Sequence, residues 1–179
     1  MLKDLLETVI LGLIQGLTEW LPISSTGHLK IAEHFLGLKV PILFDVILHF
    51  GTLIVILVFF RKDIEQVISA FSHLNFETEY GRLIPLIIVG TLPTALIGFV
   101  FGDLIEETFR QFSSIAIAFI LCGIILYSTK NSQAKTDNIS YLQAFLIGIV
   151  QGIAIIPGLS RSGTTISIAL LLGIKREKC

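Results

Sequence analysis

The sequence predicts an all-α integral membrane protein that combines re-entrant helical hairpins with spanning helices in an inverted-topology repeat, whose second copy is incomplete. The chain has 179 residues, of which 53% are hydrophobic and only 15% are charged, whereas soluble domains carry about 25% charged residues. Two segments of the chain repeat one another, and in each of them a polar kink rich in Ser and Gly interrupts a hydrophobic stretch. Three further apolar stretches are long enough to span a bilayer.

The internal repeat becomes visible when the sequence is shifted by 136 positions. Without a gap, residues 12–17, 24–27 and 36–39 then fall on residues 148–153, 160–163 and 172–175. Gln15 matches Gln151 in this alignment, and Gly27 matches Gly163. A pair of broken hydrophobic segments at corresponding positions is the best sequence indication of a binding site at the interface of a membrane repeat.

Both kinked copies are predicted to form re-entrant hairpins, at residues 5–39 and 141–175. Their second arms, residues 29–38 and 164–174, have only ten and eleven residues. Ten helical residues rise about 15 Å, which is half of a hydrocarbon core of about 30 Å. We therefore expect each hairpin to enter and leave on one side, within a single membrane domain of residues 1–179.

Residues 41–129 are expected to hold three spanning helices, at residues 41–60, 83–102 and 113–129. Residues 62–82 are expected to be a plain connector. With these spans, three Lys and Arg residues lie on one face and eight on the other. The positive-inside rule then puts the richer face in the cytoplasm. The first hairpin therefore opens to the outside and the second to the cytoplasm, so that their tips can meet at the midplane.

Polar residues around the first kink predict a catalytic or metal-binding role. Gln15 and Glu19 are four residues apart and share one helix face. Their oxygens suit a hard cation such as Mg²⁺ or Ca²⁺, and substrate oxygens would complete its coordination. The alternative is that Glu19 merely pairs with Arg161. At the tip, Ser25 needs a base or a metal to become a nucleophile, and His28 supplies an imidazole, a side chain that often acts as a base in catalysis. Helix capping and a structural hydrogen bond are the alternatives for these two residues.

The second kink predicts a phosphate site. Its glycines, among them Gly158, free backbone N–H groups to form an anion-binding concavity, and the following helix N-terminus adds partial positive charge. Arg161 supplies a planar fork for phosphate oxygens. The hydroxyl groups that offer further donors are those of Ser160, Ser162, Thr164 and Thr165.

Asp45 and His49 are also four residues apart, at the outer end of the first span. They could line the cavity, but we expect them to form a structural hydrogen-bonded pair.

The two kinks resemble the motifs of the undecaprenyl-pyrophosphate phosphatase family, the bacitracin-resistance proteins. The first motif matches Gln15-Gly-Leu-Thr-Glu19-Trp-Leu-Pro-Ile-Ser-Ser25-Thr-Gly-His28, and the second matches Pro157-Gly-Leu-Ser160-Arg161-Ser-Gly-Thr-Thr165. Both motifs are long, they occur in the family's order, and the resemblance extends through the connecting helices over essentially the whole chain. It is therefore highly specific.

The resemblance implies a lipid phosphatase that removes the terminal phosphate of undecaprenyl pyrophosphate at the outer face of the bacterial inner membrane, which recycles the cell-wall carrier lipid and confers bacitracin resistance. It implies metal and acid–base roles for Gln15 and Glu19, with Mg²⁺ or Ca²⁺ as the cofactor. Ser25 matches the family's candidate nucleophile, and His28 matches a histidine for which that role has also been considered. The implied phosphate-binding residues are Ser160, Arg161 and Thr165.

The same resemblance implies about three more spanning helices after the second hairpin, so the chain is expected to hold one full repeat and only the hairpin of the next. The rival functions are a secondary transporter or lipid flippase of the inverted-repeat type, and an inactive truncated fragment. The expected partners are undecaprenyl pyrophosphate and membrane lipid, with no nucleic acid and with a homo-oligomer left open.

Overall fold

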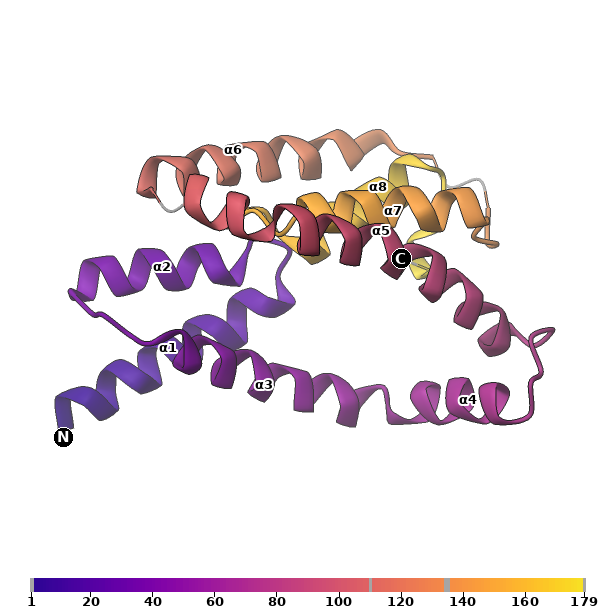
Figure 1. Cartoon of the computed structure of the whole chain (residues 1–179), viewed down its shortest axis with the longest axis horizontal. Helices are drawn as coiled ribbons and strands as arrows, with labels where there is room; N and C mark the ends of the chain where they lie inside the picture. Colours follow the sequence, from indigo (N-terminus) through magenta and orange to yellow (C-terminus); the bar gives the residue numbers. More distant parts are fainter. Residues whose placement is uncertain (1, 110, 134–135, 179) are drawn as a thin grey trace.

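The computed structural model describes residues 2–109, 111–133 and 136–178, and its architecture is helical (Figure 1). In these ranges β-structure is limited to one isolated bridge between Thr136 and Ile174. The predicted all-α fold is therefore confirmed. The helices are α1 (Leu2–Trp20), α2 (Ser25–Leu36), α3 (Ile42–Phe59), α4 (Arg61–Ser72), α5 (Glu79–Thr108), α6 (Phe112–Ser128), α7 (Tyr141–Ile153) and α8 (Arg161–Leu171), with short 3₁₀ turns at Thr129–Asn131 and Arg176–Lys178.

The two hairpins, α1–α2 and α7–α8, approach each other tip to tip. In Figure 1 the first hairpin extends to the left from the meeting point and the second extends to the right. Helix α6 packs against both α2 and α8, while the long helix α5 packs along α7. This arrangement places the two polar kinks next to each other in the middle of the molecule.

Reciprocal contacts at the tips relate the two hairpins by an approximate two-fold axis. A Cβ atom added to Gly27 would lie 3.2 Å from Gly158 Cα, and one added to Gly163 would lie 2.8 Å from the carbonyl oxygen of Pro22. The shift of 136 positions converts Gly27 into Gly163 and Pro22 into Gly158, so each contact is the image of the other. Such reciprocal pairs arise when two copies of a surface meet across a two-fold axis.

Within the described ranges, two helices are long and apolar enough to cross a membrane, at Glu79–Ile105 and Phe112–Asn131. A third span results if α3 and α4, which meet at a bend of 75°, count as one broken segment. The expectation of a plain connector at residues 62–82 was wrong, because α4 occupies most of it. Helix α5 also extends beyond the predicted span, and it contains Pro85 and Pro93, which membrane helices tolerate.

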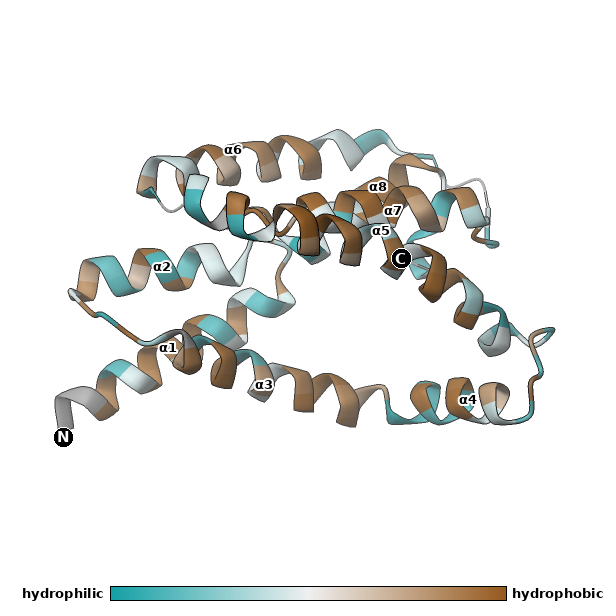
Figure 2. Cartoon of the chain, viewed as in Figure 1, coloured by the Kyte–Doolittle hydropathy of each residue, from teal (hydrophilic) through white to brown (hydrophobic). Residues whose placement is uncertain are grey.

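The distribution of polarity is that of a membrane protein. Most of the length of α3, α5, α6 and α7 has hydrophobic colours in Figure 2, and many large apolar side chains are exposed, among them Phe99, at 93%. Polar side chains are buried around the hairpin tips instead: Gln15 is 1% exposed, and Ser24, Ser25, Ser160 and Thr164 are buried as well. Such a surface suits lipid, and the buried polar interior marks the place where function is expected.

Candidate active site

The first kink turns the chain so that Ser25 reaches back to α1. Helix α1 ends at Trp20 shortly before Pro22, which cannot continue a helix. Ser24 has a φ of 70°, in the left-handed region, and its side chain caps α2 by accepting a hydrogen bond from the backbone N–H of Gly27 at 3.4 Å. The next side chain, Ser25, therefore begins α2 directly beside the end of α1.

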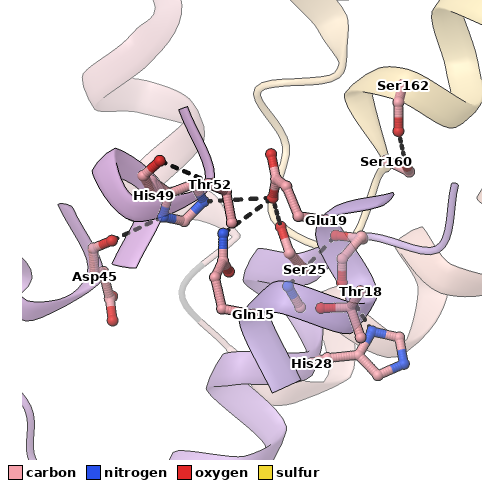
Figure 3. A network of polar contacts seen from close by, with 12 residues as sticks. Gln15, Thr18, Glu19, Ser25, His28, Asp45, His49, Thr52, Ser160 and Ser162 are labelled. Carbon is pink, nitrogen blue, oxygen red and sulfur yellow. Dashed lines mark hydrogen bonds and ion pairs between the residues drawn. The ribbon is translucent and has the colours of Figure 1, made fainter. Parts of the chain in front are cut away.

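The carboxylate of Glu19 is the centre of the resulting polar cluster (Figure 3). Its Oε2 accepts a hydrogen bond from Ser25 Oγ at 2.5 Å and another from Gln15 Nε2 at 3.1 Å. The same oxygen lies 4.0 Å from Nε2 of His49 on α3. The alternative in which Glu19 only neutralises Arg161 is wrong, since Arg161 forms no ion pair in the described part of the chain.

The second kink caps α8 and exposes Arg161. The Oγ atom of Ser160 accepts a hydrogen bond from the backbone N–H of Gly163 at 3.0 Å and lies 3.2 Å from Ser162 Oγ. Gly158 has a φ of +100°, and a Cβ atom there would lie 2.8 Å from the carbonyl oxygen of Ile115. A residue with a side chain would therefore be strained at this position as well as crowded.

Both kinks line a single pocket with a volume of about 280 Å³. The first hairpin contributes Thr18, Glu19, Ser24, Ser25 and Thr26, and the second contributes residues 154–157 and 159–162. The prediction that the two broken segments meet in one site is thereby confirmed. The pocket brings together a carboxylate-bonded hydroxyl, an unpaired guanidinium and the N-terminus of α8.

Several predicted site residues do not line this pocket. Thr164 and Thr165 donate their hydroxyls to the backbone carbonyls of Ser160 and Arg161, both at 2.8 Å, so these groups stabilise the first turn of α8. Gly158 shapes the turn rather than facing the pocket, and Gln15 lies behind Glu19. Their predicted roles in metal or phosphate binding therefore stay predictions.

His28 points away from Glu19, toward α6. Its Nδ1 lies 2.8 Å from the carbonyl oxygen of Ser24, and its ring packs edge-on against Phe119 with 5.0 Å between the centroids. Because a carbonyl can only accept, Nδ1 carries the hydrogen atom. In this arrangement His28 braces the turn that presents Ser25.

The expected hydrogen-bonded pair of Asp45 and His49 is confirmed, and the bond joins the His49 ring to the backbone carbonyl of Asp45. The carboxylate of Asp45 accepts a hydrogen bond from Lys30 Nζ at 2.9 Å, and Lys30 also contacts Glu33 at 3.0 Å. His49 Nδ1 bonds the backbone carbonyl of Asp45 at 2.8 Å instead, which leaves Nε2 toward Glu19. A histidine in an otherwise apolar span was the signal in the sequence, because intramembrane ionisable residues mark function by default.

The residues around Glu19 fit a divalent cation. The side-chain oxygen of Gln15 is buried and has no hydrogen-bond partner. Rotation of its amide by 180° would present that oxygen to the position that Nε2 now occupies beside Glu19. Mg²⁺ is commonly held by one or two carboxylates together with substrate phosphates. Among the described residues no group of three or more His, Cys, Asp and Glu side chains could hold a metal, so substrate oxygens or water would complete the coordination.

Comparison with known proteins identifies the family. The family model described as "Bacitracin resistance protein BacA" matches residues 8–179. Three relatives are named undecaprenyl-diphosphatase. The relative from Carboxydothermus hydrogenoformans is 44% identical, and the match covers 96% of this chain and 64% of the relative. The relative from Syntrophotalea carbinolica is 42% identical, and the match covers 96% of this chain and 68% of the relative. The relative from Methanosphaera stadtmanae is 39% identical, and the match covers 97% of this chain and 69% of the relative. The chain thus spans about two thirds of the length of these relatives, and it belongs to the BacA family of bacitracin-resistance proteins.

Proposed function

We propose that this protein is an undecaprenyl-diphosphatase, which hydrolyses undecaprenyl pyrophosphate to undecaprenyl phosphate and inorganic phosphate. The observation that carries the proposal is the shared pocket, in which the Ser25–Glu19 pair lies opposite Arg161. A nucleophile with its base facing an anion cradle is what phosphoryl transfer requires, whereas transport of a solute requires no nucleophile. Membership of a family whose relatives carry this name supports the same activity.

The terminal phosphate is proposed to bind at the N-terminus of α8. Arg161 lines the pocket without an ion-pair partner in the described ranges, so its guanidinium is available for two phosphate oxygens. The first backbone N–H groups of α8 and the hydroxyl of Ser162 add donors, and the helix dipole adds positive potential. Apolar residues 154–156 on the same wall suit the prenyl end of the lipid.

Ser25 is the proposed nucleophile and Glu19 the proposed general base. As Ser25 Oγ attacks the terminal phosphorus, its proton passes to Glu19 Oε2, to which it is already hydrogen-bonded. A new O–P bond forms, and the bond from phosphorus to the bridging oxygen breaks, so that undecaprenyl phosphate leaves. Glu19 passes that proton to the departing undecaprenyl phosphate. Water then attacks the phosphoserine and gives a proton to the Glu19 carboxylate, while the bond from phosphorus to Ser25 Oγ breaks. The proton passes from Glu19 to Ser25 Oγ, which frees inorganic phosphate and regenerates both residues.

Gln15 and Glu19 are the proposed ligands of a divalent cation, Mg²⁺ or Ca²⁺. Such an ion, when bound, neutralises charge on the pyrophosphate oxygens. The residues do the positioning, since Ser24 and His28 fix the turn from which Ser25 projects.

We further propose that the enzyme acts in the bacterial inner membrane with its site open to the outer side. The excess of Lys and Arg on the opposite face supports this orientation. In that location the reaction returns the carrier lipid to cell-wall synthesis, and it is the activity to which we assign bacitracin resistance. Membrane lipid surrounds the exposed apolar helices, and the oligomeric state is left open.

Release of inorganic phosphate from undecaprenyl pyrophosphate by the purified protein tests the activity. We expect turnover that chelator abolishes and Mg²⁺ or Ca²⁺ restores, and we expect Ser25→Ala to lose at least about a hundredfold. Ser72→Ala, at an exposed serine on α4, is the matched control. Full activity of Ser25→Ala would remove Ser25 as the nucleophile, and uptake of the lipid without phosphate release would favour a flippase.

The choice between Ser25 and His28 can be tested with the same assay. His28→Ala is expected to lose less activity than Ser25→Ala, because His28 braces the turn and does not face the pocket. Rapid quenching with a substrate labelled in its terminal phosphate should trap phosphoserine. If phosphohistidine is trapped in the unmodified protein and not in His28→Ala, then His28 and not Ser25 is the nucleophile.

A further inference from the structure

A third side chain, His49, faces the Glu19 carboxylate from α3, outside both sequence motifs. We propose that His49 is a ligand, through Nε2, of the divalent cation bound at Glu19, and that its nitrogen shifts the site toward transition-metal cations such as Mn²⁺, Co²⁺ or Zn²⁺ relative to Ca²⁺. The inference rests on the cation of the proposed function and adds a ligand to it.

The hydrogen bond on the far side of the ring sets the tautomer of His49. Its Nδ1 bonds the backbone carbonyl of Asp45 at 2.8 Å, and since a carbonyl oxygen only accepts, Nδ1 carries the hydrogen atom. In the neutral form of the ring, which is the form that binds metals, the lone pair is therefore at Nε2. Metal-ligating histidines almost always donate their other ring N–H to a carbonyl or carboxylate in this way.

The lone pair faces another acceptor rather than a donor. Nε2 of His49 lies 4.0 Å from Glu19 Oε2, which is beyond hydrogen-bond distance. The separation leaves room for a cation between the two atoms, because two ligands of one cation with bonds of about 2.0–2.2 Å lie at most roughly 4.4 Å apart. The view in Figure 3 shows His49, Glu19 and Gln15 converging from α3 and α1.

Local charge and burial support the same role. Asp45 is already neutralised by Lys30 at 2.9 Å, whereas the Glu19 carboxylate has no Lys or Arg partner in the described part of the chain. The orphaned side-chain oxygen of Gln15 adds a buried acceptor next to it. Glu19, His49 and, after rotation of its amide, Gln15 can each offer a lone pair to one cation.

Ligand type predicts the metal preference. Carboxylate, carbonyl and water oxygens suit Mg²⁺, Ca²⁺ and Mn²⁺, while imidazole suits transition metals. A site of Glu19 and Gln15 alone would therefore discriminate little in favour of transition metals. With His49 included, the protein should bind Co²⁺ or Zn²⁺ more tightly than Ca²⁺.

Metal binding by the purified full 179-residue chain in detergent tests the inference without any assay of turnover. Mn²⁺ added alone serves as the spectroscopic probe, and electron spin echo modulation reports a directly bound ¹⁴N nucleus. We expect this modulation in the unmodified protein and in His73→Gln, a control at an exposed histidine on α4, and its loss in His49→Gln. Calorimetric titration should show that His49→Gln lowers the ratio of Co²⁺ to Ca²⁺ affinity at least about tenfold.

Each outcome bears on the inference separately from the phosphatase activity. Nitrogen modulation that persists in His49→Gln, or an unchanged ratio of Co²⁺ to Ca²⁺ affinity, would overturn the role of His49. Neither result would affect phosphate release by the unmodified protein. Conversely, histidine-dependent metal binding by a protein that releases no phosphate would retain the ligand and reject the proposed reaction. A structural role alone would lower both affinities together and leave their ratio unchanged.

Discussion

The two hairpins share a framework but differ in the chemistry that they carry. Ser24 and Ser160 occupy equivalent positions, and each caps its following helix by accepting from the N–H of an equivalent glycine. Elsewhere the equivalent positions diverge: Glu19 corresponds to Ile155, and Ser25 corresponds to Arg161. All four of these side chains line the same pocket. One copy thus supplies acid–base and nucleophilic groups, and the other supplies a positive wall for the anion.

This division of labour follows from the approximate two-fold arrangement. An axis between the tips brings equivalent positions to opposite sides of one pocket, so a substitution in one copy changes only one wall. The nucleophile and the phosphate-binding group can therefore diverge separately while the capping serines and the tip glycines keep the framework in place. Four pairs of substitutions test how far the two copies differ.

Loss of the first copy's carboxylate should have the largest effect. Glu19→Gln keeps the shape and a hydrogen bond to Ser25 but removes the base, so kcat should fall by about 10²–10⁴-fold. Ile155→Val, at the equivalent position of the second copy, should change kcat little. The comparison is made from initial rates of phosphate release, and equal losses in the two variants would mean that the copies share the catalytic work.

Arg161→Lys should have the next largest effect, because lysine offers a point charge where arginine offers a planar fork. Hydrogen bonds to charged groups contribute about 1.5–3 kcal/mol, which corresponds to a loss of roughly ten- to 150-fold in kcat/KM. Arg82→Lys, at an exposed position on α5, is the matched control. If Arg161→Lys turns over like the unmodified protein, the guanidinium fork does not hold the phosphate.

The sequence predicted the framework well because repeats and polar kinks are local patterns. The shift of 136 positions fixed both hairpins, and the charge bias suggested that their tips meet, as the shared pocket confirms. The i, i+4 spacing predicted the hydrogen bond between His49 and Asp45, but it could not show that Nε2 of His49 faces Glu19, because the rotation of α3 about its axis depends on tertiary packing. The sequence also suggested that several hydroxyls bind phosphate, but hydroxyls in a helix can donate to backbone carbonyls instead. Thr164 and Thr165 do so in the structure.

Glycines in the first helix of each hairpin should differ in their tolerance of a methyl group. A Cβ atom at Gly148 would lie 2.0 Å from the carbonyl oxygen of Gly90, where α7 packs against α5. At Gly16 an added Cβ meets nothing within 4 Å among the described residues. Gly148→Ala should therefore destabilise by about 1–3 kcal/mol through overpacking, while Gly16→Ala should be neutral or slightly stabilising.

Thermal unfolding in detergent, followed by circular dichroism, measures this difference. A lower midpoint for Gly148→Ala alone is the expected result. Equal midpoints for the two variants would contradict the close packing of α5 on α7.

The capping serines should show the smallest effect, with a difference between the copies. Ser160 has a φ of −80°, which glycine has no advantage in adopting. Ser160→Gly should therefore lower the free energy of unfolding by about 0.4–1 kcal/mol, because glycine raises the entropy of the unfolded chain, and by a few tenths of a kcal/mol more, because the cap is lost. Ser24 has a φ of 70°, a conformation that glycine adopts without strain, so Ser24→Gly should leave stability unchanged or raise it. The same unfolding measurement compares the two variants. If Ser24→Gly proves as destabilising as Ser160→Gly, then the side chain of Ser24 contributes more than its cap, and the first kink is held by contacts beyond those shared by the two hairpins.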